Sequence, residues 1–284
     1  MRTSLCVVAL ALGGLAVAGA SWGRGGSALE APVLMYHHVQ TLEGEPGRDW
    51  LRYTVSPGVF REHLDWLARE GYGTVTAAEL GEMVTEGRTI GAAAGKKPVV
   101  LTFDDGWACC YDTVFPELVK RGMRGTFFVY PSGIGHPGYM TWEQLREMRA
   151  GGMDIQSHTV THPNLRTMRD EAALQELVVS KRTLESMLGV DSRVSVLAYP
   201  FGEYSGRTET LAEQAGYACA FSTDVGVLHT AGDLWRLKRV MVTYTDGIAE
   251  FERAVKGDDG GAGEDQRARK DAGAGGRAGV GSRG

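Results

Sequence analysis

The sequence has no surplus of basic charge. It contains 30 Lys and Arg residues against 35 Asp and Glu residues, for a formal net charge of −5. Proteins that bind nucleic acid usually carry a basic patch or stripe. We therefore expect no nucleic-acid partner, and the same acidic balance disfavours tight binding to a strongly anionic polymer.

Cysteine is scarce as well. The chain contains 4 cysteines, of which Cys6 lies in an N-terminal apolar run. Among the others, Cys109 and Cys110 are adjacent, Cys219 is remote, and none has the paired spacing of a zinc–thiolate site. Three cysteines cannot all pair within one exported chain. A bond between Cys219 and one of the adjacent pair stays open, and we expect each thiol to pack as a small apolar group.

The chain also lacks an apolar run long enough to span a bilayer comfortably, which takes ~20 residues. The run from Leu5 to Ala18 follows a positive Arg2 and ends in Ala-Gly-Ala at residues 18–20. This layout is typical of a secretory signal peptide. We predict a signal peptide at residues 1–20, with an uncleaved membrane anchor as the alternative. The mature protein is then expected to be periplasmic, extracellular or associated with the cell surface.

Large apolar residues are nearly absent from the C-terminal end. Residues 258–284 are mostly Gly, Ala and charged residues of both signs. Such a segment cannot offset its ordering entropy by burial. We predict a disordered tail over residues 257–284 and a single folded domain over residues 29–256.

Within that domain, short continuous apolar runs alternate with amphipathic stretches. The predicted strands cover residues 33–36, 99–103, 126–129, 153–156, 194–199, 218–221 and 239–242. Predicted helices begin behind Ser56-Pro57, span residues 114–121, follow a capping box of Thr141 and Gln144, and cover residues 171–188 and 208–215. Continuous apolar strands indicate a parallel sheet covered by helices. About seven of them favour an α/β fold, a distorted (β/α) barrel, over a doubly wound open sheet. No Gly-x-Gly-x-x-Gly follows the first strand, so a dinucleotide-binding fold has no support.

Polar residues directly follow four of these strands. Tyr36-His37-His38 follows the first, Asp104-Asp105-Gly106 the second, Ser157-His158 the fourth and Pro200-Phe201-Gly202 the fifth. In a parallel barrel, the carboxyl ends of all strands open on one face, where active sites are built. We therefore expect these residues to meet at one rim.

His158 and His162 are four residues apart, which places both imidazoles on one side of a helix or tight turn. One aspartate of the Asp104-Asp105 pair would complete a site of two histidines and one carboxylate, suited to Zn²⁺, Co²⁺, Ni²⁺ or Fe²⁺. Its neighbour would then accept a proton from metal-bound water, whose pKa coordination lowers to ~7. Taken alone, each motif also fits solvated turn residues, but together they favour a metal site.

Two of these motifs resemble the signatures of a known family. Residues 102–106 (T-F-D-D-G) resemble the first signature of the polysaccharide deacetylases, carbohydrate esterase family 4, also called the NodB-homology domain. Residues 157–162 (S-H-T-V-T-H) resemble the second signature. The resemblance covers most of residues 32–242 and implies a distorted (β/α) barrel. It further implies that Asp105, His158 and His162 bind a divalent metal, with Zn²⁺ as first candidate, and that Asp104 is the catalytic base.

The third signature departs from the family pattern. Many members carry R-x-P-x-G, in which the Arg braces the catalytic Asp, but here Ala198 occupies that position. Arg239 is a candidate replacement. This variant, together with residues 33–38, is similar to the deacetylases of biofilm poly-β-1,6-N-acetylglucosamine, whose motifs are circularly permuted. That subgroup implies His37 as general acid, and His229, late in the chain, is the rival.

The resemblance implies a hydrolase that removes N-acetyl groups from an N-acetylglucosamine polysaccharide, with poly-β-1,6-N-acetylglucosamine as the expected substrate. Peptidoglycan or chitin-oligomer deacetylation, O-acetyl xylan esterase activity and an inactive sugar-binding module are the alternatives. The expected partners are the polysaccharide and, through other proteins, the membrane machinery of glycan synthesis or export. The backbone N–H of Tyr199 or of a neighbour is the expected oxyanion donor. The expected substrate contacts are Tyr199, Pro200, Phe201, Gly202 and Tyr204.

Overall fold

The computed structural model describes residues 28–42, 44, 47–87, 95–189, 191–243 and 247–258. The predicted signal peptide and residues 259–284 of the predicted tail lie outside the described residues. All the strands and helices of the described part fall within residues 29–256, the predicted domain. In this part of the chain no helix is both long enough and apolar enough to cross a membrane.

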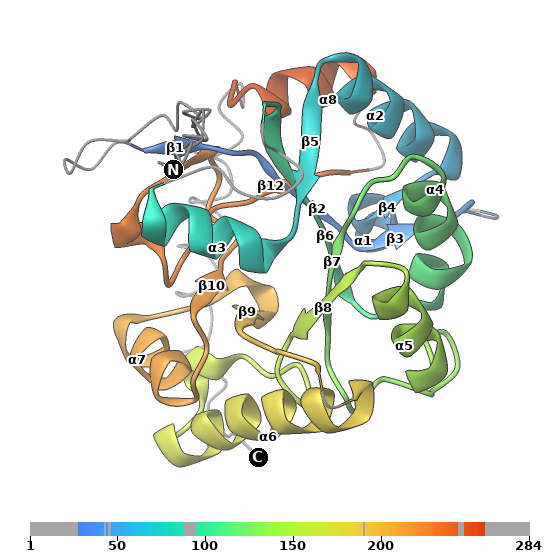
Figure 1. The fold of residues 1–284 in the computed structure, drawn as a ribbon. Helices are drawn as coiled ribbons and strands as arrows, with labels where there is room; N and C mark the ends of the chain where they lie inside the picture. The colour runs from blue at the N-terminus through green and yellow to red at the C-terminus, as the bar shows by residue number, and fades with distance from the viewer. Residues whose placement is uncertain are drawn as a thin grey trace, which may run out of the picture.

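A curved parallel sheet forms the centre of the fold (Figure 1). Its strands run in the order β10-β9-β8-β7-β6-β2-β12, and β5 pairs with β6 beside this path. Leu237, which precedes β12, forms a parallel bridge with Phe221 of β10, so the two edges of the sheet meet there. The predicted distorted barrel is thus confirmed. The strands are β2 Val33–Tyr36, β5 Tyr72–Val75, β6 Lys97–Asp105, β7 Thr126–Val129, β8 Asp154–Ser157, β9 Val196–Ala198, β10 Cys219–Phe221 and β12 Val240–Met241.

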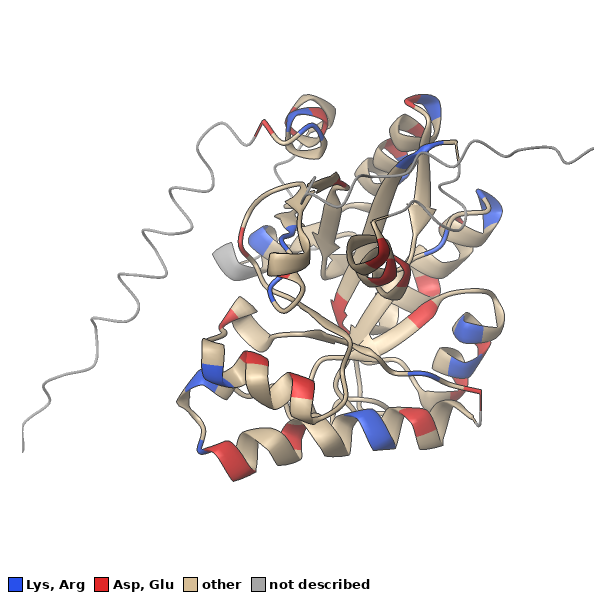
Figure 2. Cartoon of the chain, turned by 60° about the vertical axis from the view of Figure 1, so that its left-hand side comes forward, with Lys and Arg blue, Asp and Glu red and all other residues tan. Residues whose placement is uncertain are grey.

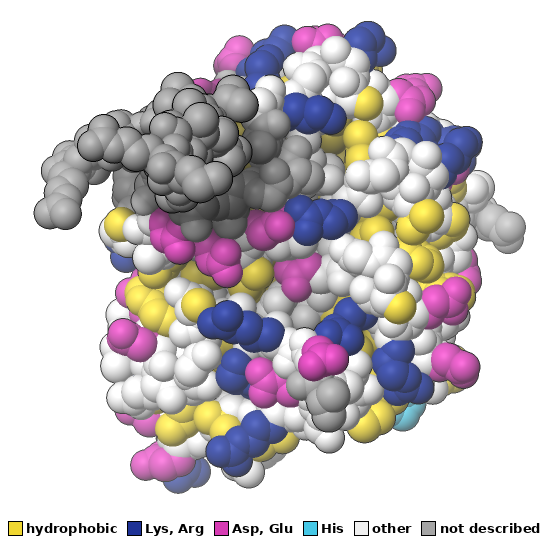
Figure 3. Space-filling view, in the orientation of Figure 1, with side chains coloured by type: hydrophobic (Ala, Val, Ile, Leu, Met, Phe, Trp, Pro, Cys, Tyr) yellow, Lys and Arg dark blue, Asp and Glu magenta, His cyan; other side chains and the backbone are white. Residues whose placement is uncertain are grey.

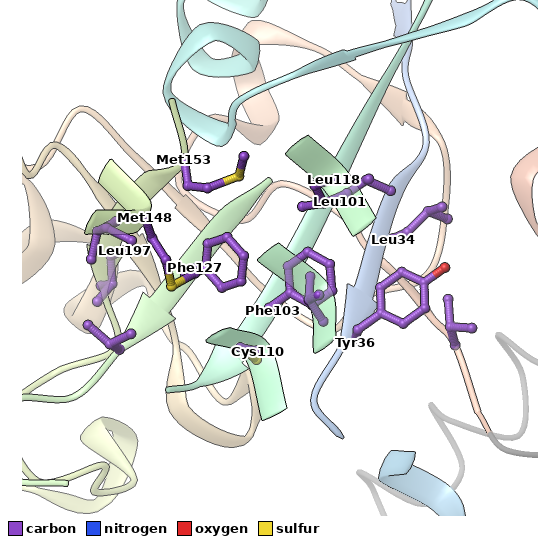
Figure 4. Close-up of a cluster of buried hydrophobic side chains, with 14 of the residues drawn as sticks. Leu34, Tyr36, Leu101, Phe103, Cys110, Leu118, Phe127, Met148, Met153 and Leu197 are labelled. Atoms are coloured by element: carbon purple, nitrogen blue, oxygen red, sulfur yellow. The ribbon is translucent and has the colours of Figure 1, made fainter. Parts of the chain in front are cut away.

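Continuous apolar runs form these strands because both faces of the sheet are covered. All four residues of β2 and of β7 are buried. Figure 4 shows Tyr36, Phe103 and Phe127 in a row on three neighbouring strands, and the Phe103 ring lies 4.8 Å from Phe127 and 5.4 Å from Tyr36, centroid to centroid. Val33, Val100 and Phe128 belong to a second buried cluster on the other face.

Helices cover the outside of the sheet (Figure 1). Thr141 and Gln144 form the predicted capping box, with the Thr141 hydroxyl accepting from the Gln144 N–H at 3.2 Å. The sequence did not predict β5, α1, α3 or α8. The helices are α1 Arg48–Tyr53, α2 Pro57–Arg69, α3 Ala77–Glu86, α4 Phe115–Lys120, α5 Trp142–Ala150, α6 Asp170–Leu188, α7 Gly206–Gln214 and α8 Ile248–Val255.

Two short two-stranded pairs complete the described architecture. The strands β1 (Leu29–Glu30) and β11 (Leu228–His229) pair antiparallel, whereas β3 (His38–Val39) and β4 (Thr54–Val55) pair parallel. On the outer helices, basic and acidic side chains are interspersed (Figure 2), and the face seen in Figure 3 shows the same mixture. The residues predicted for catalysis and metal binding lie instead at the ends of the sheet strands.

Candidate metal and catalytic site

Strand register brings the predicted site residues to one face of the sheet. Residues two apart on a strand share a face. Met35 of β2 pairs with Thr102 of β6, and the next positions on that face are His37 and Asp104. Asp104 in turn pairs with Phe128 of β7, which pairs with Gln156 of β8, two residues before His158.

A cavity of about 910 Å³ opens at these carboxyl ends. Its wall includes all five residues predicted for catalysis and metal binding: His37, Asp104, Asp105, His158 and His162. The motifs that the sequence separates by up to 125 positions therefore meet in one place. The expected common rim is confirmed.

Asp105, His158 and His162 offer three ligand atoms that lie within 4.8 Å of one another. The Asp105 Oδ1 atom is 3.6 Å from Nε2 of His158 and 3.5 Å from Nε2 of His162. Nδ1 of His158 lies 2.7 Å from the Ala198 carbonyl oxygen, which can only accept, so Nδ1 carries the proton and Nε2 keeps its lone pair. Burial lowers the pKa of His158 to about 4, which maintains this neutral form. Two imidazole nitrogens and a carboxylate oxygen fit a divalent transition metal.

Backbone strain is concentrated at the same place. Among the described residues, four that are not glycine have positive φ: Asp105 at 75°, Thr159 at 67°, His162 at 58° and Phe201 at 62°. This region of φ is unfavourable for residues with a side chain, most of all for a β-branched one. Strained residues of this kind gather at functional sites, where the surrounding structure holds them.

Asp104 is paired with Arg239 deep in the cavity wall. The guanidinium donates to Asp104 Oδ1 at 2.8 Å, and the two side chains are only 3% and 1% exposed. A further donation from Arg239 to the Ser222 carbonyl at 2.9 Å orients it. Burial alone would raise the pKa of Asp104, but Arg239, with His158 and His37, outweighs burial and holds that pKa below its usual value. Arg239 thus braces Asp104 in the structure, as expected from the Ala198 substitution.

His37 lines the cavity, whereas His229 does not. The His37 ring lies 4.7 Å from that of Tyr53, and burial lowers its pKa while Asp104 and Asp105 act in the opposite direction. His229 belongs to β11 and is fully buried. Its Nε2 atom donates to the Ala31 carbonyl at 2.9 Å. The structure therefore removes His229 from the site as the rival acid and leaves His37.

The third signature contributes Phe201 and Gly202 to the wall of the cavity. Phe201 lines it and is 61% exposed, despite being a large aromatic residue. Gly202 also lines it, at φ 66°, and a Cβ atom at that position would lie 2.1 Å from the Thr223 hydroxyl. Only glycine therefore fits behind Phe201. Of these two predicted contacts, Phe201 is exposed to a substrate, whereas Gly202 is buried and shapes the wall behind it.

Three other predicted contacts take different places. Tyr199 lines the cavity but is fully buried, and its backbone N–H donates to the Phe221 carbonyl at 3.0 Å. The Tyr199 amide is therefore used by the sheet, and its assignment as oxyanion donor was wrong. Pro200 is buried and lies outside the cavity wall. Tyr204 also lies outside the cavity wall, and its hydroxyl donates to Asp224 at 2.6 Å. Its ring stacks on that of Tyr199 at 5.8 Å between centroids, so it supports Tyr199.

The sequence reading did not single out some residues of the site. Arg52 and Tyr53 line the cavity from α1, just ahead of the Ser56-Pro57 start of α2. No motif marks them, because their role depends on how α1 folds over the β2 end. Trp107 differs from these two, because the sequence offers it, like Phe201 and Tyr204, as an aromatic residue for stacking on a sugar ring. It lines the cavity, donates to Asp105 Oδ2 at 3.1 Å and stacks on Tyr139 at 4.4 Å.

The described cysteines are free thiols. Cys110 and Cys219 are buried and Cys109 is partly buried. Burial raises the pKa of Cys219 to about 12, as expected for an inert apolar position. No disulfide joins these three residues, and Cys6 lies outside the described part of the chain.

Comparison with known proteins points to one family. Residues 91–220 match the family described as polysaccharide deacetylase. YxkH of Bacillus subtilis (strain 168), named as a polysaccharide deacetylase, is 31% identical over 223 residues, which are 78% of this chain and 75% of YxkH. The poly-beta-1,6-N-acetyl-D-glucosamine N-deacetylase of Escherichia coli (strain K12) is 23% identical, over 78% of this chain and 38% of that protein. The Streptococcus pyogenes deacetylase PplD in complex with acetate has the same fold, with a TM-score of 0.73 at 26% identity, covering 81% of this chain and 99% of PplD.

Proposed function

Because this chain belongs to the polysaccharide deacetylase family, we propose that it is a metal-dependent N-deacetylase of N-acetylglucosamine-containing polysaccharide, with poly-β-1,6-N-acetylglucosamine as its preferred substrate. The observation that carries the proposal is the convergence of Asp104, Asp105, His158 and His162 in one cavity. Support for the β-1,6-linked substrate comes from His37 at the end of β2, from Ala198 in the third signature, and from the Escherichia coli relative.

We propose Asp105, His158 and His162 as the residues that hold the metal. Zn²⁺ is the first candidate, because two imidazoles and a carboxylate with open positions are typical of catalytic zinc; Co²⁺, Ni²⁺ and Fe²⁺ suit the same donors. When bound, such an ion polarises the acetyl carbonyl and makes water a stronger nucleophile near neutral pH.

Asp104 acts as general base in this proposal. Arg239 keeps the carboxylate ionised and points Oδ1 in one direction, which leaves Oδ2 to accept a proton from the attacking water. His37 donates a proton to the leaving amine. Since burial lowers the pKa of His37, its ring is neutral in the free enzyme at pH 7, and it gains its proton during turnover. The proton taken up by Asp104 is the proposed source, because both side chains line the same cavity.

A backbone amide next to Tyr199 is the proposed oxyanion donor. The Tyr199 amide is bonded to Phe221, so the next candidate in the cavity wall is the N–H of Phe201. Its residue is held at φ 62°, a strained conformation that fixes the direction of its amide. A rigid donor aimed at the developing negative charge stabilises the transition state more than the substrate.

We further propose that the protein is exported and acts on a polysaccharide at or beyond the membrane. Support comes from the signal-like residues 1–20 and from the family's substrates. Partners in glycan synthesis or export would be other proteins.

The test is release of free amine from β-1,6- and β-1,4-linked N-acetylglucosamine oligomers, before and after chelation and metal restoration. We expect release that depends on metal and favours the β-1,6 linkage. Wild-type rates in Asp105→Ala or His158→Ala would overturn the metal site, and faster acetate release from acetylated xylan would favour the esterase alternative.

A further inference from the structure

A single carboxylate from a distant helix holds the loop between the two histidines. Glu176 lies on α6, and its Oε2 atom accepts the backbone N–H of Val160 at 2.8 Å and of Thr161 at 2.9 Å. Its other oxygen, Oε1, accepts the hydroxyl of Thr161 at 2.8 Å. Three donors of a two-residue segment therefore converge on one side chain.

The loop is strained at both ends of this segment. Thr159, at φ 67°, precedes it, and His162, at φ 58°, follows it. The His162 N–H also donates to the Thr159 hydroxyl at 3.1 Å, so the place of the histidine depends on the conformation of Thr159. Neither residue would keep positive φ unless its neighbours were fixed. Glu176 provides that restraint for the two residues between them.

The same face of α6 supports the loop a second time. Ser180 is one helical turn beyond Glu176, and its hydroxyl lies 2.8 Å from that of Ser157, directly before His158. The Ser157 hydroxyl also accepts from the Tyr217 hydroxyl at 2.7 Å. Thus α6 anchors the residue before the first histidine through Ser180, and the residues before the second histidine through Glu176. Glu176 itself is not part of the cavity wall, so any effect on the site passes through the loop.

We propose that Glu176 is a positioning residue that fixes His162 as a metal ligand and thereby sets metal affinity. This inference rests on the proposed metal site. Partners in the outer shell of a metal site typically change its affinity by 10–100-fold, because they orient the ligands before the metal arrives. We expect Glu176→Ala to weaken Co²⁺ binding by about 10–100-fold.

The experiment is a Co²⁺ titration of the metal-free full-length protein, followed by the visible absorption of the bound ion and by competition with a chelator. Thermal unfolding of the metal-free protein is measured beside it, because a role limited to stability would lower the unfolding temperature and leave the affinity and spectrum unchanged. Glu171→Ala is the matched control, since Glu171 is an exposed carboxylate on the same helix. Glu176→Gln is the rescue variant. Its amide oxygen can accept both N–H groups, and its NH₂ can donate to the Thr161 hydroxyl.

The expected result is weak binding and an altered Co²⁺ spectrum in Glu176→Ala, with near wild-type binding in Glu176→Gln and Glu171→Ala. A folded Glu176→Ala with wild-type affinity and spectrum would overturn the inference, as would an equal loss in Glu176→Gln. If Glu176→Ala does not fold, Thr161→Val is the deciding variant, because it removes only the exposed hydroxyl that donates to Glu176. A loss of Co²⁺ affinity smaller than the 10–100-fold expected for Glu176→Ala supports the inference. An unchanged affinity overturns it. Wild-type protein that binds no Co²⁺ would overturn the proposed function as well, so the two failures are distinguishable.

Discussion

Two aspartates at opposite ends of the parallel strands have contrasting surroundings. Asp104, at the carboxyl end of β6, accepts from the Arg239 guanidinium at 2.8 Å. Asp154, at the amino end of β8, accepts from the Gln156 amide at 2.7 Å and the Thr126 hydroxyl at 3.0 Å, both neutral donors. Burial raises the pKa of both carboxyls, but Arg239 and two histidines reverse the effect at Asp104, whereas at Asp154 burial prevails.

The contrast shows what each end of the strands is built to do. At the amino end, Thr126 also accepts the Ala77 N–H at 2.8 Å, so Asp154 belongs to a network that ties β7, β8 and α3 together. At the carboxyl end, a buried charge is kept ionised by a cation from the segment entering β12. An enzyme needs an ionised base in a buried cavity, and a structural network does not.

The largest expected effect comes from removing each carboxylate in turn. Asp104→Asn keeps the size of the side chain and removes the proposed base, so we expect kcat to fall by about 10²–10⁴-fold. Asp154→Asn, a matched change at the other end of the sheet, should leave kcat within about twofold. Amine release from N-acetylglucosamine oligomers measures both. Equal losses in the two variants would show that the ends do not differ in function.

The second prediction concerns the ion pair between Arg239 and Asp104. In Arg239→Met, burial is left to act on Asp104 with less opposition, so the pKa of Asp104 rises and the acid limb of kcat/KM moves to higher pH. The buried carboxylate also loses its partner, which should cost about 3–5 kcal/mol of unfolding free energy. Arg236→Met is the control, because Arg236 is 43% exposed and pairs with Glu209 at the surface. An acid limb of kcat/KM that stays at the wild-type pH would show that Arg239 does not control the pKa of Asp104.

Arg239 also shows which parts of the site the sequence could predict and which it could not. The proposed metal ligands and Asp104 lie in short motifs at strand ends, where residue type and position along a strand suffice to place them. The partner of Asp104 is 135 residues away and was identified only through the substitution at Ala198. Glu176 carried no signal at all, because it binds backbone N–H groups, which every residue type supplies.

The fold shows the same limit. Strands with continuous apolar runs, such as β2 and β7, were predicted at their observed bounds. Strand β5 was missed because its sequence, Tyr-Gly-Thr-Val, contains Gly73 and Thr74 and lacks such a run. The Tyr199 amide was misassigned for a related reason: whether an N–H is free depends on strand pairing, here with β10, which the local sequence does not reveal.

The third prediction extends the contrast to histidines. Burial lowers the pKa of both His37 and His229, but at His37 the carboxylates of Asp104 and Asp105 offset part of the effect, whereas at His229 the pKa falls from 6.5 to about 4. The unfolded chain therefore binds a proton at this residue below about pH 6.5 while the native protein stays neutral until about pH 4. This contribution to stability is fully present above pH 6.5 and is lost as the pH falls towards 4; at 1.4 kcal/mol per pKa unit it amounts to about 3 kcal/mol.

Urea unfolding of the metal-free protein at pH 7.5 and pH 4.5 tests this prediction. In His229→Gln, which cannot be protonated, we expect the difference between the two pH values to shrink by about 2–3 kcal/mol. Deacetylation at pH 7.5 should persist in the folded variant, because His229 lies outside the cavity. An unchanged pH dependence would mean that the native protein accepts a proton at His229.

The smallest expected effect is the change in unfolding free energy caused by Asp154→Asn. Because burial raises the native pKa of Asp154 above its unfolded value, ionisation costs stability, and that cost appears as the pH rises through the native pKa. Asparagine avoids the cost but accepts fewer hydrogen bonds from Gln156 and Thr126, so the change in unfolding free energy at pH 7 should stay within about 1 kcal/mol.

The pH dependence of this stability is more informative than its size. Relative to wild type, Asp154→Asn should gain stability between low pH and pH 7. Asp104→Asn should show the opposite trend, because the native pKa of Asp104 is lowered and its ionised form stabilises the fold. Urea unfolding of both variants across this range compares the two carboxylates without any substrate, and parallel curves would contradict the assignment of opposite charge environments to the two ends of the sheet.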